Sequence, residues 1–268
     1  MTVAKALTIA GSDSGGGAGI QADLKTFQEL GVYGTSALTA VTAQNTLGVH
    51  GVYPIEAEAV EKQIEAVLSD IGVNAVKTGM LFSAGIIEAA AWTLRKYECQ
   101  NLVIDPVMIA KGGASLLQKE ASEALKKVLL PLALVVTPNI PEAEVLTGMT
   151  IRSEADKKEA AERIASYGVK NVLIKGGHEE GDQTSDLLYD GEAFHTFTGR
   201  RIDTKDTHGT GCTFSAAMTA EIAKGSSVHS AAQTAKSFIQ AAIEDGLHIG
   251  EGHGPTNHWA HRQRGGQL

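Results

Sequence analysis

The sequence has little that would bind nucleic acid, cross a membrane or form a disulfide framework. It has 2 cysteines in 268 residues, too few for a disulfide scaffold or a zinc site. The formal net charge is -8 and there is no basic block, so nothing attracts the surface to nucleic acid or to an anionic membrane. No apolar run reaches the ~18 residues of a membrane helix, and the N-terminal segment lacks a signal peptide's long apolar core. We therefore expect a soluble, reduced, cytoplasmic protein without nucleic-acid or membrane partners.

The two common nucleotide-binding fingerprints are also missing. A glycine-rich loop runs from Gly11 to Gly19, but the Walker pattern needs a Lys and a Ser or Thr after its last glycine. A dinucleotide fingerprint needs an acidic residue closing the second strand, which is absent here. Asp23 falls on the first turns of the helix after this loop. It is a candidate ligand-binding carboxylate, or a residue favoured there by the helix dipole alone.

Short apolar runs alternate with longer amphipathic segments along the chain. They predict strands at 6–10, 36–42, 75–77, 102–105, 134–137 and 172–175, and helices near 18–30, 56–71, 84–97, 118–130, 141–147, 154–167, 212–223 and 228–245. This order favours one domain, 1–268, built as an α/β sandwich with a mainly parallel central sheet. A hairpin turn is expected at Asp190-Gly191, and the tail from His248 to Leu268 is expected to be loosely ordered.

The segment DTHGTGCTFSAA, which starts at Asp206, has the composition of an anion-binding turn. Gly209 and Gly211 allow successive backbone N–H groups to converge on one oxyanion at the start of a helix. Thr210 and Cys212 lie between and after them, and the same N–H groups would favour the thiolate form of Cys212. The alternative is a glycine-rich turn that only caps a core helix.

Polar residues also follow several predicted strands, where ligands of parallel sheets bind. Asn139 and Glu142 in TPNIPEAE suit Mg²⁺, or else form a capping pair for the next helix. Asp105 ends an apolar strand and is a second candidate near the metal, since a lone buried carboxylate is costly. Lys175 closes another strand before two glycines, and a solvated strand-end lysine is the alternative.

Two further residues suit a flat heteroaromatic ligand. Gln44 carries an amide that offers a donor and an acceptor, which complements an aminopyrimidine edge with its amino group beside a ring nitrogen. Met80 could cover such a ring, although methionine at this place also serves as core filler.

Taken together, these motifs resemble the ribokinase superfamily. The segments GSDSGGGAGIQADLKTF, TAVTAQN, VKTGML, VIDPVM, TPNIPEAE, KGGH and DTHGTGCTFSAA stand in its order and spacing. The resemblance is closest to the hydroxymethylpyrimidine/phosphomethylpyrimidine kinases of thiamin biosynthesis and covers about 4–246. It implies a three-layer α/β/α, ribokinase-like sandwich. It also implies two successive ATP-dependent phosphorylations, of 4-amino-5-hydroxymethyl-2-methylpyrimidine and then of its monophosphate, with ATP as co-substrate and Mg²⁺ as cofactor.

The same resemblance implies roles for individual residues. Pyrimidine-binding and pocket-lining positions match Gln44, Asp23, Gly11, Met80 and Val107; positions near Mg²⁺ and the ATP phosphates match Asn139, Glu142 and Lys175; and the anion hole matches Gly209, Thr210 and Gly211. Glu142 and Asp105 are expected near the metal, with water between.

Three further expectations follow from the resemblance. Cys212 stands where many sugar kinases carry an aspartate base, and we expect it to accept the hydroxymethyl proton in the first transfer only. Ala110 replaces a lid cysteine that related pyridoxal-phosphorylating enzymes often carry, which disfavours pyridoxal as the main substrate without removing it as the alternative. The stretch 108–117 is an expected lid, and members of the family are often dimers.

Overall fold

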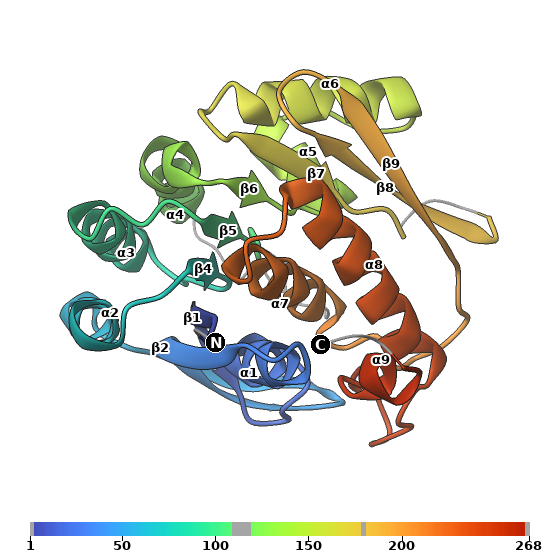
Figure 1. Ribbon diagram of the computed structural model, residues 1–268, viewed down its shortest axis with the longest axis horizontal. Coiled ribbons are helices and arrows are strands. Elements are labelled where there is room, and N and C mark those ends of the chain that lie inside the picture. The colour runs from blue at the N-terminus through green and yellow to red at the C-terminus, as the bar shows by residue number, and fades with distance from the viewer. Residues whose placement is uncertain (1–2, 109–118, 178–180, 266–268) are drawn as a thin grey trace.

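The computed structural model describes residues 3–108, 119–177 and 181–265, and a single sheet runs through the middle of the fold (Figure 1). Its strands are β1 (Lys5–Asp13), β2 (Tyr33–Asn45), β3 (Gly48–Pro54), β4 (Ala75–Thr78), β5 (Leu102–Ile104), β6 (Val135–Val136), β7 (Asn171–Ile174), β8 (Gln183–Tyr189) and β9 (Phe194–Arg200). The strand order is β3-β2-β1-β4-β5-β6-β7-β8-β9. Neighbours from β2 to β7 pair in parallel, and β3, β8 and β9 pair antiparallel at the two edges.

Helices cover both faces of this sheet. They are α1 (Gly19–Glu29), α2 (Ala57–Ala66), α3 (Ala84–Lys96), α4 (Lys119–Ala124), α5 (Ile140–Thr147), α6 (Glu154–Ala165), α7 (Thr210–Ala223), α8 (Val228–Glu244) and α9 (Ala260–Gln263). The helices α2 and α4 continue into π-helical turns at Val67–Ile71 and Leu125–Leu129, which accounts for the length of the helices predicted there. The predicted three-layer α/β/α sandwich with a mainly parallel sheet is confirmed.

The core is divided into two apolar clusters by the sheet. Along β1, Leu7 and Ile9 belong to the cluster under α2 to α6, whereas Ala6 belongs to the cluster under α1, α7 and α8. This alternation is the period of two of a strand that is buried on both faces. The helix α7 is buried from Thr213 to Ala223, so its N-terminus is held rigidly over the middle of the sheet.

One strand pair was not predicted. The strand β2 runs on through Gln44 to Asn45, and the chain turns at residues 46–47 to return as β3, with Gly48 paired to Asn45. The apolar run predicted a strand that ends at 42, but the polar residues after it extend β2 as a half-exposed ribbon, because an antiparallel pair needs only one apolar face. The hairpin around Asp190-Gly191 is present, with the backbone N–H groups of Glu192 and Ala193 donating to the Asp190 carboxylate.

The expectation of a loosely ordered tail is wrong for its described part. His208 N–H donates to the carbonyl of Gly254 (3.0 Å), and Thr256 N–H donates back to the carbonyl of His208 (3.3 Å). Thr256 and His258 are buried. Glycine and histidine predicted disorder here, but this segment supplies backbone partners to the loop before α7.

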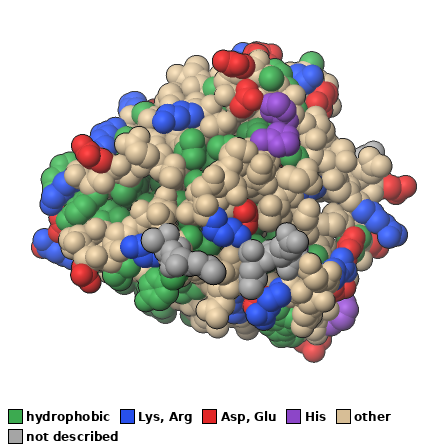
Figure 2. Space-filling model, in the orientation of Figure 1, with side chains coloured by type: hydrophobic (Ala, Val, Ile, Leu, Met, Phe, Trp, Pro, Cys, Tyr) green, Lys and Arg blue, Asp and Glu red, His purple; other side chains and the backbone are tan. Residues whose placement is uncertain are grey.

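The exposed surface carries no extended area of one charge on the face in Figure 2, where basic and acidic side chains are interspersed. Within the described ranges, no helix is both long and apolar enough to cross a bilayer.

Candidate active site

The loop between β1 and α1 is organised by a single carboxylate. Asp13 accepts hydrogen bonds from the backbone N–H groups of Gly15 (2.8 Å), Gly17 (3.0 Å) and Ala18 (2.8 Å). Burial alone would raise the pKa of Asp13, but hydrogen bonds from His208 and Ala18 outweigh it and hold the pKa below its ordinary value. The glycine loop is therefore wrapped around an ionised side chain.

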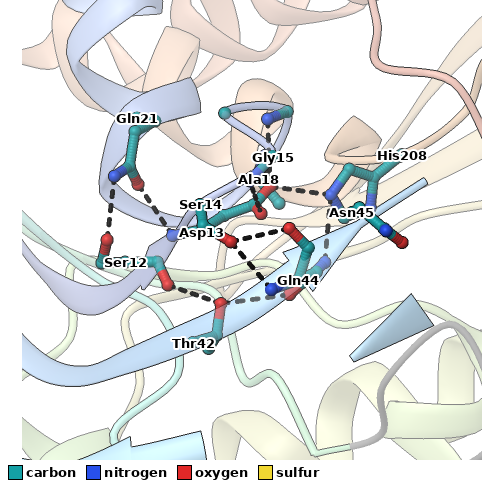
Figure 3. A network of polar contacts seen from close by, with 12 residues as sticks. Ser12, Asp13, Ser14, Gly15, Ala18, Gln21, Thr42, Gln44, Asn45 and His208 are labelled. Atoms are coloured by element: carbon teal, nitrogen blue, oxygen red, sulfur yellow. Dashed lines mark hydrogen bonds and ion pairs between the residues drawn. The ribbon is translucent and has the colours of Figure 1, made fainter. Parts of the chain in front are cut away.

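The end of β2 meets this loop at Gln44 (Figure 3). The Ser14 hydroxyl donates to the Gln44 carbonyl (2.6 Å), and the Gln44 backbone N–H donates to the Ser14 hydroxyl oxygen (2.8 Å). The Gln44 amide nitrogen lies 3.1 Å from Nε2 of His208, which is itself 2.8 Å from Asp13 Oδ2. Segments nearly 200 residues apart thus meet around the side chain predicted to bind the pyrimidine.

The predicted pocket-lining residues Gly11 and Met80 lie against each other. A Cβ added to Gly11 would be 2.5 Å from the terminal methyl carbon of Met80, so a side chain there would displace the methionine. Val107 is half-buried two residues after Asp105 and lines a small cavity together with Gly79 and Asp105.

Asp23 occupies a different environment from the one expected. Both of its carboxylate oxygens are 2.8 Å from Lys77 Nζ, and one also accepts from the Thr8 hydroxyl (2.6 Å). Neither Asp23 nor Lys77 is exposed. Burial raises the pKa of Asp23, with Lys77 opposing the shift, while the Asp23 carboxylate raises the pKa of Lys77 against the effect of burial. The contact of Lys77 Nζ with both carboxylate oxygens at 2.8 Å is the geometry of an ion pair. Contact of Asp23 with a ligand stays a prediction, and the partner seen in the structure is Lys77.

The predicted anion-binding turn packs directly on the glycine loop. Gly209 has φ +82° and precedes the first residue of α7, and a Cβ at this position would overlap the carbonyl oxygen of Gly17. Only glycine allows both this conformation and this approach. The Thr210 hydroxyl donates to the Thr207 carbonyl (2.7 Å), so its side chain closes the turn.

Lys175 and Asp105 reach the same turn from the ends of β7 and β5, the two strands on either side of β6. Their side chains form an ion pair with 3.0 Å between Nζ and Oδ1. A Cβ added to Gly211 would lie 3.3 Å from Lys175 Nζ and 3.6 Å from Asp105 Oδ2. Burial lowers the pKa of Lys175, but Asp105 and Glu142 outweigh it and the net pKa is raised. A permanent positive charge therefore lies beside the N-terminus of α7.

Asn139 and Glu142 form the capping pair that was the alternative reading of TPNIPEAE. The Glu142 backbone N–H donates to the Asn139 side chain, and the Asn139 backbone N–H donates to the Glu142 carboxylate, both at 2.8 Å. The pair still belongs to the site, because the backbones of Asn139 and Lys175 form an isolated parallel β-bridge. Burial raises the pKa of Glu142 to about 7, with Lys175 opposing the shift and the charge of Asp105 adding to it. Capping and ligand binding are therefore compatible here.

The expected activation of Cys212 is wrong for the protein without ligands. Burial raises the pKa of this thiol to about 11; Lys77 opposes the shift, while Asp23 and Asp105 reinforce it. The resting form at neutral pH is the thiol. The start of a helix favours the thiolate, but desolvation and two carboxylates outweigh that effect.

Sequence reasoning missed Lys77, Asp13 and His208. A lysine inside the apolar run AVKT was a usable signal, because a charge in a buried strand needs a partner. His208 lies within the anion-binding segment itself, but no pattern in the chain tied it to Asp13. The expected lid, 108–117, lies outside the described residues from 109 onward.

The arrangement suits a magnesium ion better than a metal held by the protein alone. Among the residues that the structure describes, no cluster of three or more His, Cys, Asp or Glu side chains could hold a metal. Mg²⁺ keeps several waters and takes one or two carboxylates beside phosphate oxygens. Asp105 and Glu142 fit this requirement, since they repel each other and Lys175 is the nearby cation that offsets them.

The chain is similar over most of its length to kinases of one family. The family model described as phosphomethylpyrimidine kinase matches residues 13–257. A hydroxymethylpyrimidine/phosphomethylpyrimidine kinase of Bacillus subtilis is 57% identical over 264 residues, which are 98% of this chain and 97% of the relative. The pyridoxine kinase of the same organism is 48% identical over 98% of each chain.

A solved structure shares the whole fold. The pyridoxal kinase of Staphylococcus aureus in complex with AMP-PCP and pyridoxal superposes with a TM-score of 0.91 at 42% identity, covering 98% of this chain and 96% of the other. With a family model over most of its length and relatives well above 30% identity, this chain belongs to the phosphomethylpyrimidine kinase family, a group of ribokinase-like vitamin kinases.

Proposed function

We propose that this enzyme phosphorylates 4-amino-5-hydroxymethyl-2-methylpyrimidine with ATP and then phosphorylates the monophosphate, as a step of thiamin biosynthesis. The observation that carries the proposal is the convergence of Gln44 with the turn that leads to Gly211. His208 contacts Gln44 and is followed directly by Gly209, the residue before α7. Two residues further on, Gly211 lies against Lys175 and Asp105. A heteroaromatic alcohol at Gln44 would thus lie next to a phosphate bound at Gly211 and Lys175.

Alignment and charge stabilisation supply most of the catalysis in phosphoryl transfer. Lys175 and the first N–H groups of α7 would hold the transferring phosphoryl group, in a site where burial strengthens each contact. Thr210 and Gly209 shape the turn that presents those N–H groups. Met80, Gly11 and Val107 would enclose the ring, and Asn139 would lie near the nucleotide phosphates.

Magnesium is part of the proposal. Glu142 and Asp105 would hold it through water, and it would neutralise phosphate charge during transfer. Before it binds, Lys175 offsets part of the charge of both carboxylates.

Cys212 would accept the hydroxymethyl proton late in the first transfer. Burial raises the pKa of this thiol to about 11, so only the minor thiolate form, whose own proton has already gone to solvent, would accept the proton that leaves the alcohol. In the second transfer the acceptor is a phosphate oxygen that is already ionised, so no base is needed.

Two assays on one variant test this role. We expect Cys212→Ala to lose far more of the first activity than of the second, with ATP consumption followed for each pyrimidine separately. Equal losses in the two assays would remove the proton-acceptor role and leave a role in shaping the anion site. Absence of pyrimidine-dependent ATP consumption by the unmodified enzyme would remove the proposed function.

A second candidate activity is phosphorylation of pyridoxal or pyridoxine. The 48% identity to a pyridoxine kinase favours it, and Ala110 at the place of the lid cysteine opposes it as the main reaction. Comparing kcat/KM for the pyrimidine and for pyridoxal separates the two, and we expect the pyrimidine to be preferred.

We further propose a cytoplasmic homodimer. Exposed apolar side chains on β2, on β3 and in the turn between them, among them Tyr33, Leu47 and Tyr53, support a contact between copies along this edge. Sedimentation analysis and cell fractionation test the two statements.

A further inference from the structure

In the network around Gln44, the donor and the acceptor of each hydrogen bond can be assigned, beginning with Asp13. This carboxylate accepts from three backbone N–H groups and from His208 Nε2, with distances of 2.8 to 3.0 Å (Figure 3). An ionised carboxylate has no proton to donate. His208 Nε2 must therefore carry the proton that lies between it and Asp13.

The opposite end of the network is fixed as well. The Thr42 hydroxyl donates to the Ser12 carbonyl at 2.8 Å, so its single proton is already in use. Thr42 Oγ1 also lies 3.4 Å from the Gln44 amide oxygen. Because its proton is used, the Thr42 oxygen can only accept a hydrogen bond from Gln44, so the end of the amide that faces it must be the N–H end.

Gln44 lies between these two groups and has one amide to satisfy both. With its nitrogen toward His208, two donors would face each other across 3.1 Å, and two acceptors would face each other at Thr42. The two ends of an amide have nearly the same shape, so its partners decide which end faces which neighbour. A half-turn of the amide places its nitrogen toward Thr42, where it donates, and its oxygen toward His208, where it shares with Asp13 the single Nε2 proton in a bifurcated hydrogen bond.

We infer that the Asp13–His208 pair fixes the orientation of the Gln44 amide, and that His208 is thereby a specificity-determining positioning residue. The inference rests on the proposed function, in which Gln44 binds the pyrimidine. The fixed amide offers its remaining acceptor site on the His208 side and its remaining N–H on the Thr42 side. It therefore recognises an amino group and a ring nitrogen in one order only.

The order matters because a related pyrimidine presents the reverse pattern. Replacing the 4-amino group by a 4-oxo group puts an acceptor where the donor was and an N–H where the ring acceptor was. A fixed amide rejects this analogue, because two mismatched pairs are then buried together. An amide that is free to turn accepts both compounds.

The test compares kcat/KM for the 4-amino alcohol and for its 4-oxo analogue in the unmodified enzyme and in His208→Ala. We expect the preference for the amino compound to fall by about tenfold or more, which is the effect of one mismatched polar contact. The change should lie in KM for the pyrimidine, with KM for ATP unchanged. His208→Gln, whose amide nitrogen can replace the Nε2–H donor, should restore most of the preference.

The chain offers a matched control. His195 makes the same 2.8 Å contact with Asp190 in the β8–β9 hairpin, away from Gln44, so His195→Ala should leave the preference unchanged. An unchanged preference in His208→Ala, or an equal loss for both compounds through kcat alone, overturns the inference. An unmodified enzyme that turns over neither pyrimidine overturns the proposed function and the inference with it.

Discussion

Gly209 packs so closely on the carbonyl of Gly17 that a methyl group has no room between them. The contact joins the first loop of the sheet to the turn at the start of α7. We expect Gly209→Ala to reduce kcat/KM by about 100-fold, the effect of displacing catalytic groups by about 1 Å. Steady-state kinetics with both pyrimidines measure the change.

Gly225 provides the control for that variant. It also has a positive φ, +94°, but a Cβ there would meet nothing within 4 Å. Gly225→Ala should cost about 1 kcal/mol of stability from backbone strain and leave kcat/KM unchanged. Similar kinetics in the two variants would show that the contact with Gly17 does not position the turn.

The buried pair of Lys77 and Asp23 should dominate stability near the site. Lys77→Met leaves the Asp23 carboxylate buried without its cation, and we expect a loss of about 3–5 kcal/mol in the free energy of unfolding. Urea denaturation measures it. Adding Asp23→Asn removes the uncompensated charge and should recover part of the loss. If the double variant is less stable than Lys77→Met alone, the ion pair is not the cause.

Cys212 should react slowly with alkylating agents at neutral pH. In a Cys99→Ala background, its rate with iodoacetamide should rise about tenfold per pH unit up to about pH 11, because only the thiolate reacts. Lys77→Met should slow the reaction further at a given pH, since Lys77 is the charge that opposes the raised pKa. A rate that levels off below pH 8 would contradict the protonated resting state.

Stability should fall on acidification because of His258. This side chain is buried, its Nε2 lies 3.1 Å from the Thr213 hydroxyl, and burial lowers its pKa to about 4. The unfolded chain binds a proton below its ordinary pKa of about 6.5, and the folded protein does not until about pH 4. The free energy of unfolding is therefore highest, as far as His258 is concerned, above about pH 6.5. It falls by about 3 kcal/mol between about pH 6.5 and pH 4.

Comparing unfolding free energies at pH 7 and pH 5 measures this effect. His258→Gln should show a smaller difference between the two pH values, while His195→Ala, in an exposed hairpin, should keep the full difference. A pH dependence that is identical in the unmodified protein and His258→Gln would contradict this assignment.

The fold followed from the sequence because strand and helix periodicities are local properties. The same holds for the turn at Gly209, where glycine marks a conformation that other residues avoid. Pairing between distant charges is not local. Lys77 is 54 residues from Asp23, and Asp13 is 195 residues from His208, so no pattern along the chain could join them. Gln44 could be proposed from its chemistry, but the neighbours that decide its orientation could not.

The turn before α7 is fastened by segments that are made at very different times during synthesis. Strands β1 to β7 leave the ribosome with Gln44 and Met80 already in place, whereas Gly254 and Thr256, which bond to the backbone of His208, follow after the whole sheet. A nascent chain can thus complete its sheet, including the strand that carries Gln44, while the turn before α7 still lacks its hydrogen bonds to Gly254 and Thr256. We therefore expect catalytic competence only after residues 254–256 have been synthesised and have bonded to the backbone of His208.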